Sequence, residues 1–228
     1  MSNPVRIAFY SDVHCPYAYL SAYRLQQLRE EYRGKIIIEY KSLALEYINK
    51  RPTPKFILDN ETPLILLQEP AIPYQPWNAS LTEWPVTMLP AFEAIKCAER
   101  QGAEQAADLD WAIRVAFFHG SKCISMRSVL FELAEQVGLD MQRFEDDYDG
   151  GVAKRLVIQE AREGWEQLHV PNSPTIVLPG GEQLSYFALP RVGLDPRHNF
   201  RVSSFEPARL DGKSPLDLYR ALLESVLQ

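Results

Sequence analysis

One cysteine in this sequence stands where a thiol can do chemistry. Cys15 lies in the segment FYSDVHCPYAYLSAYRL, residues 9–25, at the point where an extended apolar stretch becomes a helical pattern. The first N–H groups of a helix have no partner within the helix, and together with the helix dipole they stabilise an anion. We therefore expect the pKa of the Cys15 thiol to fall below the free value of about 8.5, which favours the thiolate that attacks disulfides and electrophiles.

The residue three positions later restricts this chemistry to a single thiol. Ala18 stands where a Cys-X-X-Cys site would have its second cysteine. A mixed disulfide on Cys15 then cannot collapse within the motif, but glutathione or another small thiol can resolve it. His14 could assist if protonated, although neighbouring side chains in an extended segment usually point apart. The alternative interpretation is a buried structural cysteine, because free cysteines are commonly buried.

The other cysteines, the histidines and the acidic residues give weaker indications of chemistry. Cys97 falls inside a helical pattern and is best interpreted as a small core residue, whereas Cys123 precedes a helix and could be more exposed. Three cysteines cannot form a complete set of intramolecular disulfides, which indicates free thiols in a reducing, cytoplasmic setting. Neither the histidines nor the acidic run at 146–149 has the spacing of metal ligands, so we expect no metal and no tightly bound cofactor.

The elements around Cys15 predict a βαβ unit. Residues 5–10 have the composition of a strand, a helix is expected from about Pro16 to Tyr32, and residues 36–40 predict a second strand. Proline suits the first turn of a helix because its missing N–H would be unpaired there. Such a unit pairs its two strands in parallel.

The remaining chain divides into three parts. Residues 42–86 contain seven prolines and predict a long ordered loop with at most a helical turn near 54–60. A helical block follows, with helices expected at 90–101, at 109–118, after an N-cap at Ser125, after an N-cap at Asp140, and after Gly150-Gly151. The last part predicts a hairpin of 174–178 and 183–189, an irregular stretch at 190–212, and a helix at 214–227.

Without the helical insert, this order is that of a thioredoxin core. The sequence thus predicts an α/β thioredoxin fold with an inserted all-helical subdomain. We assign residues 1–50 and 152–228 to the core, and 51–151 to the inserted loop and helices. In such folds a cis proline before the third strand faces the active cysteine, so we expect a cis bond at Ser173-Pro174. Its ring cannot donate, which leaves the backbone of Ser173 to pair with an extended peptide or with glutathione.

With these residues in place, the sequence resembles the DsbA-like thioredoxin-fold family. The stretch YSDVHCPYAYL is similar to a family pattern S-D-x-x-C-P-x-x-Y, and LPAFEAIKCAERQG, FFHGSKCISMRSVLFELAEQVGLD and PNSPT are similar to its insert and proline loop. The closest resemblance is to the FrnE-type and 2-hydroxychromene-2-carboxylate isomerase-like branch, which includes kappa-class glutathione transferases. Dithiol members have cysteine at the position of Ala18, and the isomerase and transferase members often have serine at that of Cys15, so this chain falls between two patterns.

The resemblance implies roles for the residues that match it. Cys15 is the expected catalytic residue, with glutathione as the co-substrate. Supporting residues around it are His14, Pro16, Tyr17 and Pro174. Residues expected to contact glutathione or substrate are Ser11, Asp12, Ser173 and Pro174.

Composition excludes several classes of function. The net charge of -6 and the absence of a basic stripe disfavour nucleic acid and membrane surfaces. The N-terminus lacks the pattern of a signal peptide, and no apolar stretch is long enough to span a membrane. A hydrophobic content of 46% is sufficient for a core.

Three functions remain. The first is a monothiol, glutathione-linked thiol-disulfide oxidoreductase acting on a small-molecule or protein disulfide. The second is a glutathione-dependent isomerase or transferase, with an apolar substrate held between core and insert near Phe92, Phe117, Phe118 and Trp77. The third is a non-catalytic binding module. A homodimer is compatible with each.

Overall fold

A four-stranded sheet forms the centre of the computed structural model, which describes residues 3–228. Its strands are β1 (Val5–Ser11), β2 (Ile36–Ser42), β3 (Thr175–Val177) and β4 (Gln183–Ser185), in the order β2-β1-β3-β4. β1 and β2 pair in parallel, as expected for a βαβ unit, while β3 is antiparallel to both β1 and β4. The thioredoxin fold expected from the element order is confirmed.

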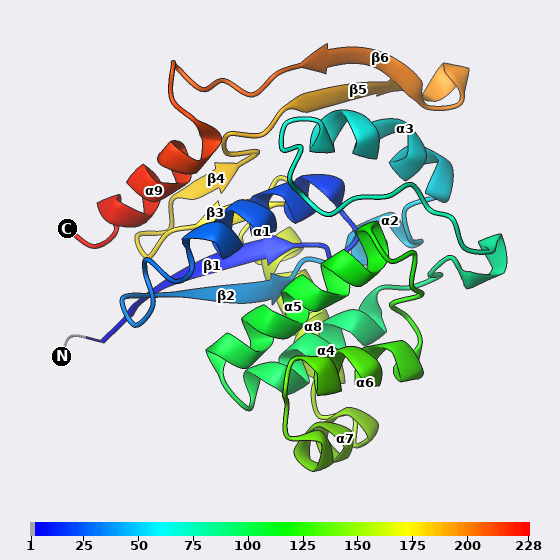
Figure 1. Ribbon diagram of the computed structural model, residues 1–228, viewed down its shortest axis with the longest axis vertical. Coiled ribbons are helices and arrows are strands. Elements are labelled where there is room, and N and C mark those ends of the chain that lie inside the picture. Colours follow the sequence, from blue (N-terminus) through cyan, green and yellow to red (C-terminus); the bar gives the residue numbers. More distant parts are fainter. Residues whose placement is uncertain (1–2) are drawn as a thin grey trace.

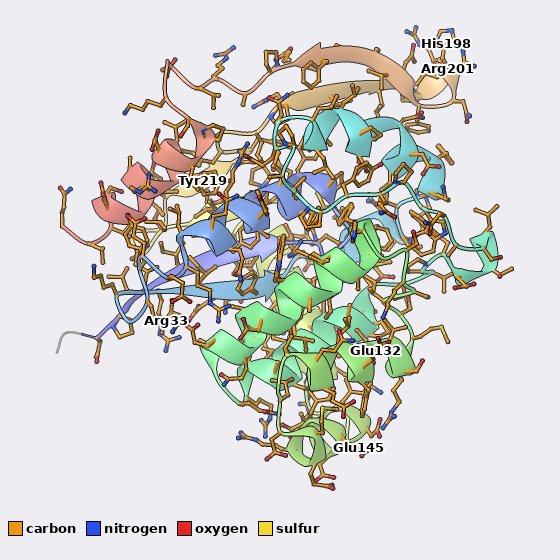
Figure 2. The ribbon with its side chains drawn as sticks, viewed as in Figure 1. Arg33, Glu132, Glu145, His198, Arg201 and Tyr219 are labelled. Carbon is orange, nitrogen blue, oxygen red and sulfur yellow. The ribbon has the colours of Figure 1, made fainter. Side chains whose placement is uncertain are left out.

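Helix α1 (Pro16–Leu28) connects β1 to β2 and packs against α9 (Pro215–Ser225). The prediction that α1 reaches Tyr32 is wrong, since the chain leaves the helix after Leu28 and passes through turns to Gly34, whose φ is +75°. Figure 2 shows Tyr219 of α9 beside α1, and its hydroxyl lies 2.7 Å from that of Ser21. The two helices are thus tied together by a buried polar contact.

The proline-rich segment is more helical than the sequence indicates. It contains α2 (Leu45–Asn49), α3 (Lys55–Leu66) and a short 3-10 turn, η1 (Leu81–Glu83). The expectation of a long loop fails because Pro54 is at the extended N-cap of α3 and only Pro63 lies inside the helix. Packing of α3 on α1, with Leu58 and Ile65 buried, favours the helix despite Pro63.

The helical block after the proline-rich segment contains four helices and leads into a fifth. These are α4 (Leu89–Glu99), α5 (Ala103–Phe118), α6 (Arg127–Gln136), α7 (Met141–Asp149) and α8 (Lys154–Arg162), the last continuing as a π-helical turn, η2 (Glu163–Gln167). α5 starts six residues earlier than expected. Ser125 is not the N-cap of α6, because its hydroxyl donates to the Thr87 carbonyl (2.6 Å) and Met126 takes the cap position. Asp140 is the predicted N-cap of α7 and accepts from the Arg143 N–H.

The stretch expected to be irregular, 190–212, forms a second sheet. β5 (Arg191–Asp195) pairs antiparallel with β6 (Arg201–Glu206). The turn between them has left-handed φ angles at Asn199 and Phe200, which the sequence pattern does not reveal. β6 is exposed along its length, so this hairpin lacks the hydrophobic alternation from which strands are predicted.

Figure 1 shows how these parts are arranged: α4 to α7 lie beyond one edge of the main sheet, and the β5–β6 hairpin lies at the opposite end of the molecule, with α3 between it and α1. The division into core and insert at residues 50 and 152 stays a prediction. Among residues 3–228, no helix has both the length and the apolar character needed to span a membrane.

Candidate active site

Cys15 occupies the N-cap position of α1, immediately before Pro16. Its thiol donates a hydrogen bond to the Ser173 carbonyl (3.3 Å), and the Ser173-Pro174 bond is cis, the conformation expected from the sequence. Ala18, at the position of the missing second thiol, is fully buried. The structure therefore brings the sulfur and the proline loop together across 158 residues of chain, and the Ser173 carbonyl is occupied by the thiol.

The loop before Cys15 is fixed by Asp12. The Asp12 N–H donates to the Ser173 hydroxyl (2.8 Å), so the same residue of the proline loop is held from two sides. The Asp12 carboxylate accepts hydrogen bonds from the Leu45 N–H (2.7 Å) and from the His14 N–H, and lies 2.6 Å from His14 Nδ1. Burial opposes the charge of Asp12, but the His14 charge and these hydrogen bonds hold its pKa below the ordinary value.

A buried arginine connects the insert to this loop. Arg114 of α5 donates to the Asp12 carbonyl (3.0 Å) and to the Ser11 hydroxyl (2.8 Å), and forms an ion pair with Asp110 at 2.8 Å. Ser11 and Asp12 are buried with internal partners, so in this conformation they hold the loop. Their contact with glutathione or substrate stays a prediction.

The His14 ring contacts Asp12 and Phe117 and makes no hydrogen bond to the Cys15 thiol that it was expected to assist. Asp12 binds its Nδ1, and Phe117 of α5 packs edge-on against it, with the centroids 6.2 Å apart. Within the described residues no hydrogen bond joins the ring to the Cys15 sulfur, and Nε2 is buried without a partner. In this conformation His14 binds Asp12 and holds the loop, and its supporting role at Cys15 stays a prediction.

The expectation of a lowered thiol pKa is wrong for this conformation. Burial raises the pKa of Cys15 to about 12, and the charges of Glu61 and Asp12 add to this effect, whereas the Ala18 backbone N–H lowers it. Cys15 is only 6% exposed. The helix terminus is present as predicted, but loss of solvent around the sulfur outweighs it.

Two tyrosines interact with the thiol, and the hairpin is bonded to one of them; we call Tyr17, Tyr186 and β5–β6 the cover. The rings of Tyr17 and Tyr186 meet edge-on at 4.9 Å, and the Val192 N–H of β5 donates to the Tyr17 hydroxyl (3.0 Å). The charges of Cys15 and Glu61 add to burial in raising the pKa of Tyr186 to about 12. At the other end of the hairpin, where Figure 2 shows His198 and Arg201 projecting, the Asn60 side chain of α3 donates to the Phe200 carbonyl (2.9 Å).

Sequence reasoning missed Glu61. It lies on α3, and burial raises its pKa to about 7 although the His14 charge lowers it. Its charge acts on Cys15, Tyr17 and Tyr186. The signal that could have found it is helical spacing with Leu58 and Ile65, which becomes informative only once residues 55–66 are known to be a helix.

An aromatic pocket lies beside His14, between α3, the following loop and the end of α5. It is a small, partly open pocket with a cavity volume of about 30 Å³, and it is lined by Leu58, Asp59, Thr62, Tyr74, Gln75, Trp77, Trp84, Phe117 and Phe118. Phe92 packs in the core and does not line it. Among residues 3–228 no group of three metal-ligating side chains occurs.

The sheet, α1 and the cis proline opposite Cys15 define a thioredoxin fold with a helical insert. A family model described as thioredoxin matches residues 9–183. The chain belongs to this thioredoxin family, and the resemblance inferred from the sequence is confirmed.

Solved structures share the fold at low sequence identity. The cytosolic disulfide reductase DsbM from Pseudomonas aeruginosa is 19% identical with a TM-score of 0.70, covering 98% of both chains, and its complex with GSH is 18% identical with a TM-score of 0.68, covering 98% of this chain and 99% of that one. A Nitrosomonas europaea protein named as a candidate disulfide isomerase is 16% identical (TM-score 0.69; coverage 99% and 98%). A 2-hydroxychromene-2-carboxylate isomerase is 19% identical (TM-score 0.57; coverage 78% and 87%).

Proposed function

We propose that this protein is a thiol-disulfide oxidoreductase that acts through the single thiol of Cys15, with glutathione as the second thiol. The observation that carries the proposal is the position of Cys15, at the N-cap of α1 and 3.3 Å from the carbonyl of the cis-proline loop, with Ala18 at the second-thiol position. Small-molecule and protein disulfides are the proposed substrates.

The reaction consists of two thiol exchanges. The Cys15 thiolate attacks one sulfur of a disulfide, the S–S bond breaks, and the other half leaves as a thiolate that takes up a proton. Cys15 is now oxidised in a mixed disulfide. A glutathione thiolate attacks this mixed disulfide, reforms the Cys15 thiol and keeps the second half as a glutathione disulfide.

The first step requires the sulfur to leave its covered state. Burial is the largest cause of the raised Cys15 pKa. When the cover opens or a substrate enters, that penalty falls, while the Ala18 N–H and the other free N–H groups of the first turn remain to stabilise the thiolate. The helix terminus thus acts in the open state.

The glutathione link and the compartment have separate support. A structural relative has been solved with GSH, and the same relative is named as cytosolic. Cys15, Cys97 and Cys123 are all free thiols in the structure, which suits a reducing cytoplasm. A homodimer stays a prediction.

The test is mass spectrometry of the whole protein after incubation with oxidised glutathione at pH 8. We expect one glutathione adduct, located on Cys15 by peptide mapping, which excess reduced glutathione removes. Cys123→Ser is the matched control and should still form the adduct, whereas Cys15→Ser should form none. An adduct confined to Cys123 would contradict the proposal.

A glutathione-dependent isomerase or transferase is the second candidate. The aromatic pocket beside His14 favours it, because Trp77, Trp84 and Phe117 provide apolar surface on which a flat apolar substrate can pack. Glutathione would then bind without a covalent bond to Cys15, and calorimetry with reduced glutathione would show saturable binding that persists in Cys15→Ser. If neither the adduct nor the binding is observed, the non-catalytic binding module is the function that remains.

A further inference from the structure

Glu61 differs from the other carboxylates of the interior in having no partner. The fully buried carboxylates are all matched to a base: Asp12 to His14, Asp110 to Arg114 and Glu160 to Lys96. Glu61 is half-buried, and within residues 3–228 its side chain makes no hydrogen bond and no ion pair. Burial removes part of this carboxylate from water without a cation to compensate its charge, which leaves its oxygens available to a group that binds the protein.

The groups whose pKa values depend on the charge of Glu61 indicate that it lies near the reactive sulfur. Its charge acts on Cys15 and Tyr17 at the start of α1 and on Tyr186 of the cover, and the His14 charge acts on it. α3 packs directly against α1, and Figure 1 shows α3 lying along α1 beneath the hairpin. Glu61 therefore lies on the helix that packs against both α1 and β5, close enough for its charge to act on Cys15.

Two more polar atoms on this side of the site lack partners. The Thr62 hydroxyl, next to Glu61 on α3, and His14 Nε2 are both buried without a hydrogen bond. Both atoms lie near Phe117, which packs on the His14 ring and lines the same pocket as Thr62. The unpartnered atoms of Glu61, Thr62 and His14 therefore lie where α3, the Asp12–Cys15 loop and α5 meet.

No buried base is free to neutralise Glu61, and the one nearby base without an ion pair among the described residues, Arg191, is exposed to solvent. Arg114 is fully engaged by Asp110, Ser11 and the Asp12 carbonyl, and Lys55 pairs with Asp59 on the outer side of α3. Arg191 is exposed and lies over the Tyr186 ring. His14 is held by Asp12. The local charge that a substrate meets beside Cys15 is therefore negative.

We propose that Glu61 is a substrate-binding residue that selects disulfides bearing an ammonium group close to the sulfur. An ammonium supplies the missing cation and up to three N–H donors for Glu61 and its unpartnered neighbours. The inference rests on the proposed exchange at Cys15: the thiolate attacks one sulfur of the ammonium disulfide, the S–S bond breaks, and the aminothiol half leaves as a thiolate and takes up a proton.

The experiment compares three small disulfides of similar size and different charge. These are cystamine (cationic), bis(2-hydroxyethyl) disulfide (neutral) and 3,3′-dithiodipropionate (anionic). Rate constants for adduct formation at Cys15 are measured by mass spectrometry in Cys97→Ser/Cys123→Ser protein and divided by those for N-acetylcysteine, which removes differences in intrinsic reactivity. We expect cystamine to exceed dithiodipropionate by about tenfold or more at low salt, and the ratio to decrease as salt is added.

Glu61→Gln removes the charge and keeps the shape, and should reduce this ratio to within about twofold of unity. Glu135→Gln, which removes one exposed carboxylate of α6 that makes no ion pair among the described residues, is the matched control and should leave the ratio unchanged. A ratio near unity in the parent protein, or an equal effect of both substitutions, overturns the inference while leaving the proposed function in place. Failure of all three disulfides to modify Cys15 overturns the proposed function, and the inference with it.

Discussion

At Cys15, two effects of opposite sign act on one sulfur. The start of α1 provides N–H groups that stabilise a thiolate, while burial beneath Tyr17 and Tyr186 destabilises it. In the covered structure burial is the larger effect, so the thiol is protonated at neutral pH and donates its hydrogen to Ser173. The Cys15 thiol thus stays protonated and unreactive until the cover opens.

This arrangement predicts the pH dependence of alkylation at Cys15. Because the pKa is raised to about 12, the thiolate fraction increases about tenfold per pH unit at neutral pH and above. In Cys97→Ser/Cys123→Ser protein, the iodoacetamide rate should therefore keep increasing from pH 7 to pH 9.5, where an unperturbed cysteine thiol with a pKa of about 8.5 already approaches its plateau. A plateau below pH 8.5 would show that the open, thiolate-stabilising state dominates instead.

The same reasoning applies to the charge selectivity attributed to Glu61. Its pKa of about 7 means that it gains charge as the pH rises through neutrality, among His14, Cys15, Tyr17, Tyr186 and the exposed Arg191. The ratio of the cystamine to the dithiodipropionate rate cancels the ionisation of Cys15 and should increase between pH 6 and pH 8. A ratio that is constant over this interval contradicts a titrating carboxylate at the site.

At the scale of elements, the cover depends on few contacts. The β5–β6 hairpin belongs to its own two-stranded sheet, β6 is exposed throughout, and one hydrogen bond joins the Val192 N–H to the Tyr17 hydroxyl. A second joins Asn60 of α3 to Phe200. Few buried contacts permit local opening at low free-energy cost.

Tyr17→Phe should therefore expose the thiol more often. Loss of one hydrogen bond of about 1 kcal/mol corresponds to an increase of about fivefold in the iodoacetamide rate at pH 8. Tyr32→Phe is the control, because the Tyr32 hydroxyl also makes one hydrogen bond to the backbone, here as the donor to the Arg220 carbonyl, but joins the turn after α1 to α9. Equal rates in both variants would show that the Tyr17 hydrogen bond does not hold the cover.

At the scale of the whole molecule, the insert is part of the active-site support. Arg114 of α5 reaches across to Ser11 and Asp12, so the loop that positions Cys15 is fixed by a helix about 100 residues later in the chain. Asp110 and Arg114 are fully buried and bind each other four residues apart on α5. Removing one partner leaves a buried charge without compensation.

Arg114→Met should therefore lower the free energy of unfolding by about 3–5 kcal/mol in urea denaturation. The control is Arg162→Met, which breaks an exposed arginine–carboxylate pair of the same four-residue spacing, with Glu166, and should cost at most about 1 kcal/mol. If the two substitutions have similar effects, the insert does not brace the loop as the structure indicates.

The sequence by itself determined the parts of this protein that depend on local chemistry. Proline after Cys15 and the spacing of apolar residues are sufficient to place a helix N-terminus at that thiol, and the order of elements is sufficient for the thioredoxin core and the loop before Pro174. The exposed β5–β6 strands and the proline-containing α3 escaped prediction because their stability comes from packing on distant elements.

Only the tertiary structure decided the state of the site. The Cys15 pKa depends on how much water the cover removes, and apart from Tyr17 the cover comes from residues 170 or more positions further along the chain. The unpaired carboxyl of Glu61 lies near Cys15 only because α3 packs on α1. Desolvation and charge pairing are properties of neighbours in space, which spacing along a chain does not specify.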